Sequence, residues 1–171
     1  MKLLVLCVLV FSEMAWAGAD PVPDDGSADE ESMDLIQRSA SCPSGWSEYN
    51  GNCYHYVSLP MNWASAEKNC MSMGGHLASV HNLREYHQIQ NVIKMASYGS
   101  NSAWIGGYNA QKTSLWFWSD GSEFHYTNWC PGEPNNVQGN QHCLEMNYYA
   151  AKCWVDFQCC ARRPSVCAKK V

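Results

Sequence analysis

The sequence has no apolar run of membrane-spanning length. Its longest run, residues 3–11, falls well short of the roughly 20 residues that a bilayer-crossing helix needs. Lys2 precedes this run, and the small-residue pattern Ala15-Trp16-Ala17 follows it, which is typical of a signal peptide covering residues 1–17. A buried N-terminal helix is the alternative interpretation. We expect a secreted, extracellular protein that does not insert into membranes.

The motifs of common enzymes and of nucleic-acid binding proteins are also missing. There is no G-x-S-x-G, no H-E-x-x-H and no pair of catalytic acids, and the six histidines are scattered along the chain. The 11 lysines and arginines form no basic stripe and are outnumbered by 16 acids. We therefore expect neither an enzyme nor a nucleic-acid partner.

The excess of acids lies in one segment near the start. Residues 18–41 carry seven acids and one base, together with Pro21 and Pro23, whereas residues 42–171 are close to neutral. Such a segment buries too little apolar surface to order itself. We predict an acidic disordered leader or pro-segment over residues 18–41 and a folded domain over residues 42–171. A specific role for the acids of the leader is the alternative.

Cysteine, in contrast, is abundant. Of ten cysteines, Cys7 lies in the predicted signal peptide, and nine follow it. In a small secreted domain this number predicts a disulfide framework, and the spacing is poor for zinc. Because nine is odd, one thiol is left free or joins another chain. The nine are Cys42, Cys53, Cys70, Cys130, Cys143, Cys153, Cys159, Cys160 and Cys167.

The apolar pattern predicts two helices among several strands. Asn62 is a good N-cap for a first helix, which Gly74-Gly75 would end. Asn82 with Glu85 forms a capping-box-like start for a second helix. The inner faces would carry Trp63, Ala66, Cys70 and Met71 in the first helix, and Tyr86, Ile89, Val92 and Ile93 in the second. Strands are expected at residues 52–57, 103–107, 115–118, 143–148, 152–157 and 165–168.

A long polar segment interrupts the predicted strands. Residues 127–141 contain two prolines, four asparagines and two glycines and show no apolar period. A loop of this length in a compact domain is usually functional or disordered. Its part from Gly132 to Asn136 could also be only a polar loop on a structural relic.

Together these residues resemble the C-type lectin-like domain, whose motifs occur here in order from residue 42 to about 168. The matching pieces are Cys42-Pro43-x-Gly45-Trp46, Trp63-x-x-Ala66-Glu67-x-x-Cys70, Gly75-His76-Leu77-Ala78-Ser79-Val80, Trp104-Ile105-Gly106-Gly107, Trp118-x-Asp120-Gly121, Asn128-Trp129, Gly132-Glu133-Pro134-Asn135-Asn136, Cys143-Leu144-Glu145, Trp154-x-Asp156 and Val166-Cys167. The resemblance implies an α+β fold with two helices, two small antiparallel sheets and a long binding loop, stapled by disulfides.

The resemblance also implies a disulfide pattern. The family's common bridges correspond to Cys70–Cys167 and Cys143–Cys159, and its long form adds Cys42–Cys53. Cys130 and Cys153 are placed like an extra disulfide bridge in the type II antifreeze proteins of fish. Cys160 then remains as the unpaired cysteine. Exchange between Cys159 and Cys160 is an equal possibility for that pair. An unpaired Cys160 could also link two chains into a homodimer.

In the lectins that the chain resembles, a calcium ion joins the protein to the sugar. Calcium is a hard cation that takes about six to eight oxygen ligands. The resemblance assigns both calcium and carbohydrate binding to Glu133, Asn135, Gln141 and Asp156, with Pro134 in the cis form. The family usually has Glu at position 141 and Asn at position 155. Gln141 contributes no charge and Val155 no oxygen, so a weakened site is expected.

The expected function is a secreted lectin that recognises glycans with the help of calcium, as in innate defence. Glu133-Pro134-Asn135 implies a mannose-type sugar, whereas Gln141 and Val155 argue against tight binding. One alternative is an ice-binding protein like the type II antifreeze proteins, although only Thr113 and Thr127 are threonines. A calcium-independent protein-binding module is the other.

Overall fold

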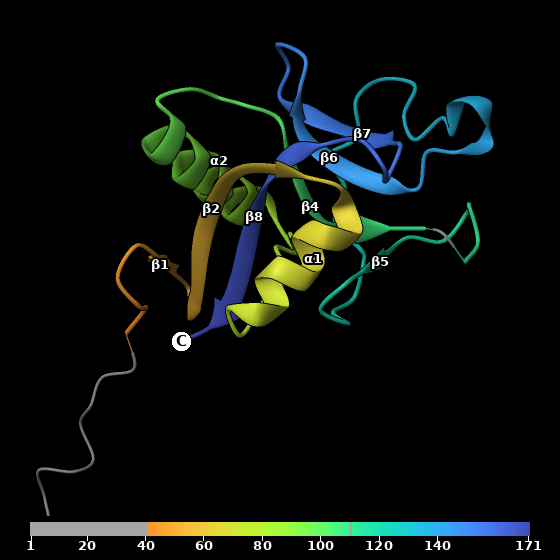
Figure 1. The fold of residues 1–171 in the computed structure, drawn as a ribbon. Coiled ribbons are helices and arrows are strands. Elements are labelled where there is room, and N and C mark those ends of the chain that lie inside the picture. Colours follow the sequence, from red (N-terminus) through yellow and green to blue (C-terminus); the bar gives the residue numbers. More distant parts are fainter. Residues whose placement is uncertain (1–40, 110) are drawn as a thin grey trace, which may run out of the picture. The chain divides into compact units, whose positions relative to one another are not determined.

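The computed structural model describes residues 41–109 and 111–171. The predicted signal peptide and all but the last residue of the predicted leader lie outside this part of the chain. Within it, no helix is both long and apolar enough to cross a membrane. The elements follow one another as β1 (Ser47–Tyr49), β2 (Asn52–Met61), α1 (Trp63–Ser72), β3 (His76–Leu77), α2 (Leu83–Ser97), β4 (Ala103–Tyr108), β5 (Phe117–Trp118), a short 3-10 helix (Val137–Gly139), β6 (Cys143–Tyr148), β7 (Cys153–Phe157) and β8 (Arg163–Lys170), as Figure 1 shows.

Both helices begin at the predicted N-caps. The side chain of Asn62 accepts a hydrogen bond from Ser65 N at 2.8 Å, and that of Asn82 accepts one from Glu85 N at 2.9 Å. These bonds satisfy backbone donors that a first turn leaves without an intrahelical partner. After α1 the chain turns at Gly74, whose φ of +80° suits glycine. The helix ends are therefore local properties of the sequence.

One prediction about the helix faces is wrong. The side chain of Met71 was expected on the inner face of α1 but is 57% exposed, while Ala66 and Cys70 are fully buried. Met71 follows Cys70 directly, and one residue turns an α-helix by about 100°. A narrow buried stripe centred on Ala66 and Cys70 therefore leaves Met71 outside. In α2 the buried face contains Tyr86, Ile89 and Ile93, as expected, with Val92 partly buried.

The strands expected as two small antiparallel sheets are connected into one. The order is β1-β2-β8-β4-β6-β7, with β3 on β8 and β5 on β4. All pairings are antiparallel except β4 with β8, which run parallel and meet at Trp104 and Ser165. This contact, the single parallel one between named strands, joins an antiparallel group containing the first and last strands to a second group next to the long loop. The α+β class is confirmed, with α1 against β3 and β8 and α2 against β2 (Figure 1).

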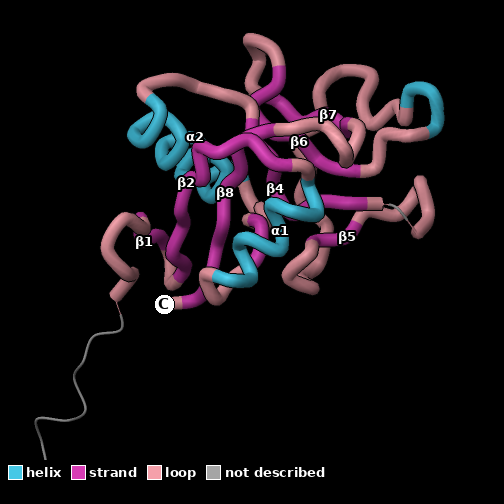
Figure 2. The backbone as a smooth tube through the Cα atoms, in the orientation of Figure 1, coloured by secondary structure: helices cyan, strands magenta, loops and turns pink. Residues whose placement is uncertain are grey.

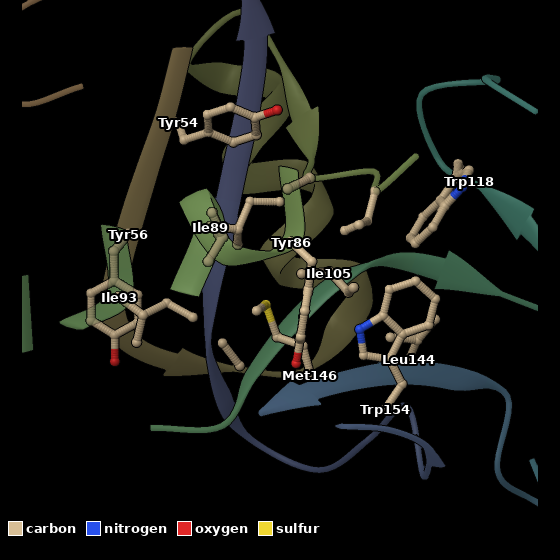
Figure 3. Packing of buried hydrophobic residues seen from close by; sticks show 14 residues of the cluster. Tyr54, Tyr56, Tyr86, Ile89, Ile93, Ile105, Trp118, Leu144, Met146 and Trp154 are labelled. Carbon is tan, nitrogen blue, oxygen red and sulfur yellow. The ribbon is translucent and has the colours of Figure 1, made fainter. Parts of the chain in front are cut away.

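The main core lies between α2 and the sheet. Its large side chains come from β2, α2, β4 and β6, and from Trp118 and Trp154 near the long loop (Figure 3). A second cluster surrounds the Cys70–Cys167 bridge and contains Ala66, Leu77 and Trp104. Aromatic rings link the core to the loop, because Trp154 packs edge-on against Trp118, Tyr126 and Trp129. The loop is thus anchored on a rigid aromatic base.

Four disulfide bonds staple the domain, and they are the pairs that the resemblance implied. They join Cys42 to Cys53, Cys70 to Cys167, Cys130 to Cys153, and Cys143 to Cys159. Among the described residues Cys160 is the free cysteine, and it is exposed. β2 pairs along most of its length with β8, from Asn52 opposite Lys170 to Met61 opposite Arg163. The first long strand and the last strand therefore lie side by side.

Candidate functional site

The long loop leaves the aromatic base at Trp129 and returns at the start of β6. Cys130 N donates to Trp154 O at 2.8 Å and Trp154 N to Asn128 O at 2.8 Å, so backbone hydrogen bonds hold the outgoing end against β7. The Cys130–Cys153 bridge reinforces this end, and Cys143–Cys159 closes the other. In Figures 1 and 2 the loop, with its single short helix, lies at the upper right, well away from the carboxyl terminus. The loop is consequently fixed at both ends by β7 and its disulfides.

Asp156 holds the middle of the loop in place. Its side chain is almost fully buried, and its two carboxylate oxygens accept hydrogen bonds from Asn135 N at 3.0 Å and Asn136 N at 2.8 Å. These residues follow the Glu133-Pro134 peptide bond, which is cis. A carboxylate that accepts two backbone N–H groups is strongly oriented. Asp156 therefore sets the position of the predicted site residues in the loop.

The other predicted side chains join the same network. Asn135 Nδ2 donates to Glu133 Oε1 at 2.9 Å, and Val137 N donates to both Asn135 Oδ1 (3.0 Å) and Gln141 Oε1 (2.7 Å). Glu133, Asn135, Gln141 and Asp156 thus lie together, although they span 24 positions from first to last when counted inclusively. Their oxygens give a donor set of two carboxylates and two amides.

One residue of this network was not identified from the sequence. Asn136 Oδ1 accepts a hydrogen bond from Gln141 N at 3.0 Å, which ties the start of the loop to its end. The backbone of Asn136 has a φ of 44°, a left-handed conformation that asparagine tolerates better than most residues. The sequence does show a second asparagine, Asn136, directly after Asn135. Only Asn135 matches a ligand position of the family, so the role of Asn136 was not predicted.

Glu133 occupies an unusual electrostatic position. Its Oε2 is buried and makes no hydrogen bond. Burial, and then the Asp156 carboxylate close beside it, raise the pKa of Glu133 to about 7. Two carboxylates this close cannot both ionise without a cost, so a proton or a cation between them is favoured. A free carboxylate oxygen beside a second carboxylate fits a hard cation such as calcium.

Val155 does not take part in the network. It packs with Cys130 and Cys153 in a small apolar cluster, and lies opposite Glu145 in the pairing of β6 with β7. Side chains alternate along a strand, so Val155 faces away from Trp154 and Asp156. The described residues contain no group of three or more His, Cys, Asp or Glu placed to hold a metal. A calcium ion here would therefore depend on amide oxygens, backbone carbonyls or water for most of its ligands.

The fold and this loop define a class of protein: a C-type lectin-like domain, with a cis-proline loop braced by two disulfides. The chain belongs to the C-type lectin family, because a family model described as Lectin C-type domain matches residues 59–169.

Known relatives include lectins and antifreeze proteins. The chain is 39% identical to ladderlectin of Oncorhynchus mykiss over 137 residues, which cover 80% of this chain and 72% of that one. It is 41% identical to the galactose-specific lectin nattectin of Thalassophryne nattereri over 133 residues, covering 78% and 83%. The crystal structure of a calcium-independent type II antifreeze protein superimposes with a TM-score of 0.69 at 36% identity, covering 76% of this chain and 95% of that one.

Proposed function

We propose that the chain is a secreted lectin whose loop, residues 133–141, recognises a glycan with the help of a weakly bound calcium ion. One observation carries the proposal: the oxygens of Glu133, Asn135, Gln141 and Asp156 share one network in which Glu133 Oε2 is buried without a partner. Buried polar atoms are nearly always satisfied, so an unpaired carboxylate oxygen beside another carboxylate favours a cation.

The roles of the loop residues follow from their chemistry. A bound calcium ion would coordinate hydroxyl groups of the sugar. The Glu133 carboxylate can accept a hydrogen bond from a hydroxyl, and the Asn135 amide can donate one. Asn135 and Pro134 are exposed, which supports a role for them in contacting an incoming sugar. The Glu133-Pro134-Asn135 order favours a mannose-type sugar, while the likeness to a galactose-specific lectin makes galactose the necessary comparison.

The affinity for calcium should be low. Two carboxylates and two amides supply four side-chain ligands, fewer than the six to eight oxygens that calcium prefers. Gln141 is neutral, and Val155 faces an apolar cluster. We expect a dissociation constant of about 10⁻⁴–10⁻³ M, the range of weak extracellular calcium modules.

Calorimetric titration with calcium tests the proposal. The wild type should give saturable heat, Glu133→Ala should give none, and Gln141→Glu should bind about tenfold more tightly because it adds a third carboxylate. Glu48→Gln, at an exposed position on β1, is the matched control and should behave as wild type. Absence of heat in both the wild type and Gln141→Glu would contradict calcium binding. Elution from mannose and galactose columns by EDTA then tests glycan binding.

A second candidate function is ice binding. The Cys130–Cys153 bridge and the likeness to a calcium-independent antifreeze protein favour it. Thermal hysteresis measured in EDTA at millimolar protein separates the two candidates. Hysteresis without column binding would replace the lectin proposal, whereas its absence would remove ice binding.

We further propose that the chain has no catalytic role, although three side chains have the spacing of a catalytic triad. Ser122 Oγ lies 2.9 Å from His81 Nε2, and His81 Nδ1 lies 3.0 Å from Glu85 Oε2. However, Ser122 Oγ also lies 2.6 Å from Asp120 Oδ1, and an ionised carboxylate can only accept. Ser122 therefore donates its proton to Asp120 and accepts from His81, which leaves His81 unable to act as a base toward it. The relatives described above are likewise lectins and antifreeze proteins.

A further inference from the structure

The solvent-facing side of α2 combines cations with exposed apolar residues. The helix buries Tyr86, Ile89 and Ile93, and the one acid in its sequence, Glu85, is buried as well. The opposite side of the helix is exposed and therefore contains cations but no acid. Its members are Leu83, Arg84, His87, Asn91, Lys94 and Met95. In Figure 1 this helix lies at the left, away from the loop over residues 133–141.

The apolar members of this side are well exposed to water. Met95 is 78% exposed, and Tyr98, which directly follows the last residue of α2, is 97% exposed. Lys94, Met95 and Tyr98 are three or four positions apart, which is the spacing of neighbours on a helix surface. Leu83 is exposed at the other end of the helix. Several large apolar side chains that share one exposed face indicate a surface that contacts another molecule.

Tyr98 also has a backbone conformation that does not suit its side chain. Its φ of 55° lies in the left-handed region, where glycine is the usual residue after a helix. Because the ring is almost fully exposed, packing does not offset this strain. A second turn repeats the pattern, since Tyr149 has a φ of 50° and is 68% exposed. Strained residues that the core does not require favour a functional role.

Hydrogen bonds hold these two turns together. Lys152 Nζ donates to Ser100 O at 2.8 Å, and Asn147 Nδ2 donates to Asn101 O at 3.3 Å. The two exposed tyrosines therefore lie on adjacent turns at the carboxyl end of α2. Lys152 keeps two further N–H groups, which adds a cation at this end. Residues 98–102 and 147–152 contain no acid.

We propose that the α2 face, meaning the exposed side of α2 together with Tyr98 and the turn of Tyr149, binds the surface of an anionic lipid membrane. The helix lies along the membrane surface and does not cross it. Arg84, Lys94 and Lys152 contact lipid phosphates, and each cation near such a surface contributes to the attraction. Met95 and Tyr98 enter the boundary between headgroups and acyl chains, where the apolar ring and polar hydroxyl of tyrosine are both accommodated.

The apolar residues favour a membrane over a soluble polyanion. A sulfated polysaccharide would contact the cations but would leave Leu83 and Met95 in water. A lipid surface supplies anionic headgroups and an apolar layer together, which is the environment that a helix with a basic, apolar face binds. The charge and the exposed apolar area of the α2 face are then complemented by the same partner.

Sedimentation with lipid vesicles tests the proposal. The disulfide-bonded chain is mixed with vesicles of equal parts phosphatidylglycerol and phosphatidylcholine, or of phosphatidylcholine alone, in EDTA so that the proposed calcium site stays empty. Binding should be at least about tenfold tighter to the anionic vesicles and should weaken as salt is added. Equal binding to both vesicles, or none to either, would overturn the proposal. Binding to soluble dextran sulfate without binding to vesicles would overturn it as well.

Tyr98→Gly separates membrane binding from folding. Glycine adopts the left-handed backbone without strain, so the melting temperature should not fall. Vesicle affinity should fall about tenfold, because a large side chain no longer enters the lipid. Unchanged vesicle affinity in this variant would contradict the role of the tyrosine.

A matched pair of lysine variants tests the charge. Lys94→Gln should weaken binding to anionic vesicles about fivefold, since it removes one cation from the α2 face. Lys68→Gln makes the same change at an exposed position of α1, outside this face, and should bind as wild type. Equal weakening in the two variants would show that net charge, and not the α2 face, determines binding.

Discussion

At the scale of single residues, the position of Glu133 beside Asp156 is the feature that supports the proposed cation site. The Asp156 side chain is already committed to the backbone of Asn135 and Asn136, so it cannot move away from Glu133. Burial and this neighbour together raise the pKa of Glu133 to about 7, from an ordinary value of 4.5. The protonated form of Glu133 is therefore favoured in the folded protein, and ionisation at higher pH works against the fold unless a cation is present.

This shift predicts a pH dependence of stability in calcium-free buffer. Because the folded-state pKa is the higher one, the stabilising contribution of Glu133 is complete below pH 4.5 and is lost as the pH rises through about 7. Glu133→Gln, a neutral mimic of the protonated acid, should lose this dependence. At pH 8 it should be more stable than wild type by about 1 kcal/mol, a value reduced for the partial exposure of the side chain. Urea unfolding at pH 5 and pH 8 measures the difference, and a gap that is equal at both values would contradict it.

At the scale of elements, the helices are determined locally and the loop is not. The caps of α1 and α2 are formed by residues three positions apart, whose side chains need no distant partner. The loop over residues 133–141, in contrast, contains one short helical turn and depends on Asp156 and on two disulfides. Loss of one cap should therefore weaken the domain without changing the geometry of the site.

The cap of α1 offers a direct test of this separation. Asn62→Ala removes the acceptor for Ser65 N and should lower the free energy of unfolding by about 1 kcal/mol. Asn91→Ala, at an exposed interior position of α2, is the control and should not destabilise the protein, because alanine is the better helix former. Calcium affinity should be the same in both variants. A loss of calcium binding in Asn62→Ala would show that the helix and the loop are coupled.

At the scale of the whole molecule, disulfides joining distant segments contribute most to stability. Cys70 and Cys167 are 97 positions apart and connect α1 to β8, whereas Cys42 and Cys53 are 11 apart within one hairpin. In the chain-entropy description a loop of about 100 residues contributes roughly 4.7 kcal/mol, and one of about 15 residues roughly 3 kcal/mol.

Paired substitution tests this order. Cys70→Ala with Cys167→Ala should lower the melting temperature more than Cys42→Ala with Cys53→Ala. The first pair is also fully buried in the cluster around Trp104, so its loss removes packing as well. Differential scanning calorimetry of both double variants measures the comparison. Equal losses, or a larger loss for the hairpin bridge, would contradict the dominance of the long-range bridge.

The free Cys160 thiol is the basis for a prediction about the oligomeric state of the protein. It is exposed and free in a chain whose other described cysteines are all paired. We expect a disulfide-linked homodimer, in which two copies of the proposed glycan site would bind clustered ligands together. A non-reducing gel should show a dimer that Cys160→Ser converts to monomer. A monomer band in the wild type would reject this assembly.

The sequence alone was enough for the fold class and the helix starts, and it supplied the residues of the proposed site. Local caps, apolar periods and an ordered series of motifs carry that information, because each depends on residues close together in the chain. Some expectations needed correction even so: Met71 is exposed, and the strand expected at residues 115–118 contains only Phe117 and Trp118. Burial depends on what packs against an element, and a pattern of apolar residues does not contain that information.

Tertiary structure alone decided how the site residues interact and what lies elsewhere on the domain. The contact of Asp156 with Asn135 and Asn136, the link from Asn136 to Gln141 and the unpaired oxygen of Glu133 arise because β7 packs under a loop some 20 positions earlier in the chain. A cavity lined by β2, β8 and two turns likewise exists only because these segments meet in the fold. The sequence gives the residue types of the site. The interactions between their charges depend on distances between side chains, which only the folded chain determines.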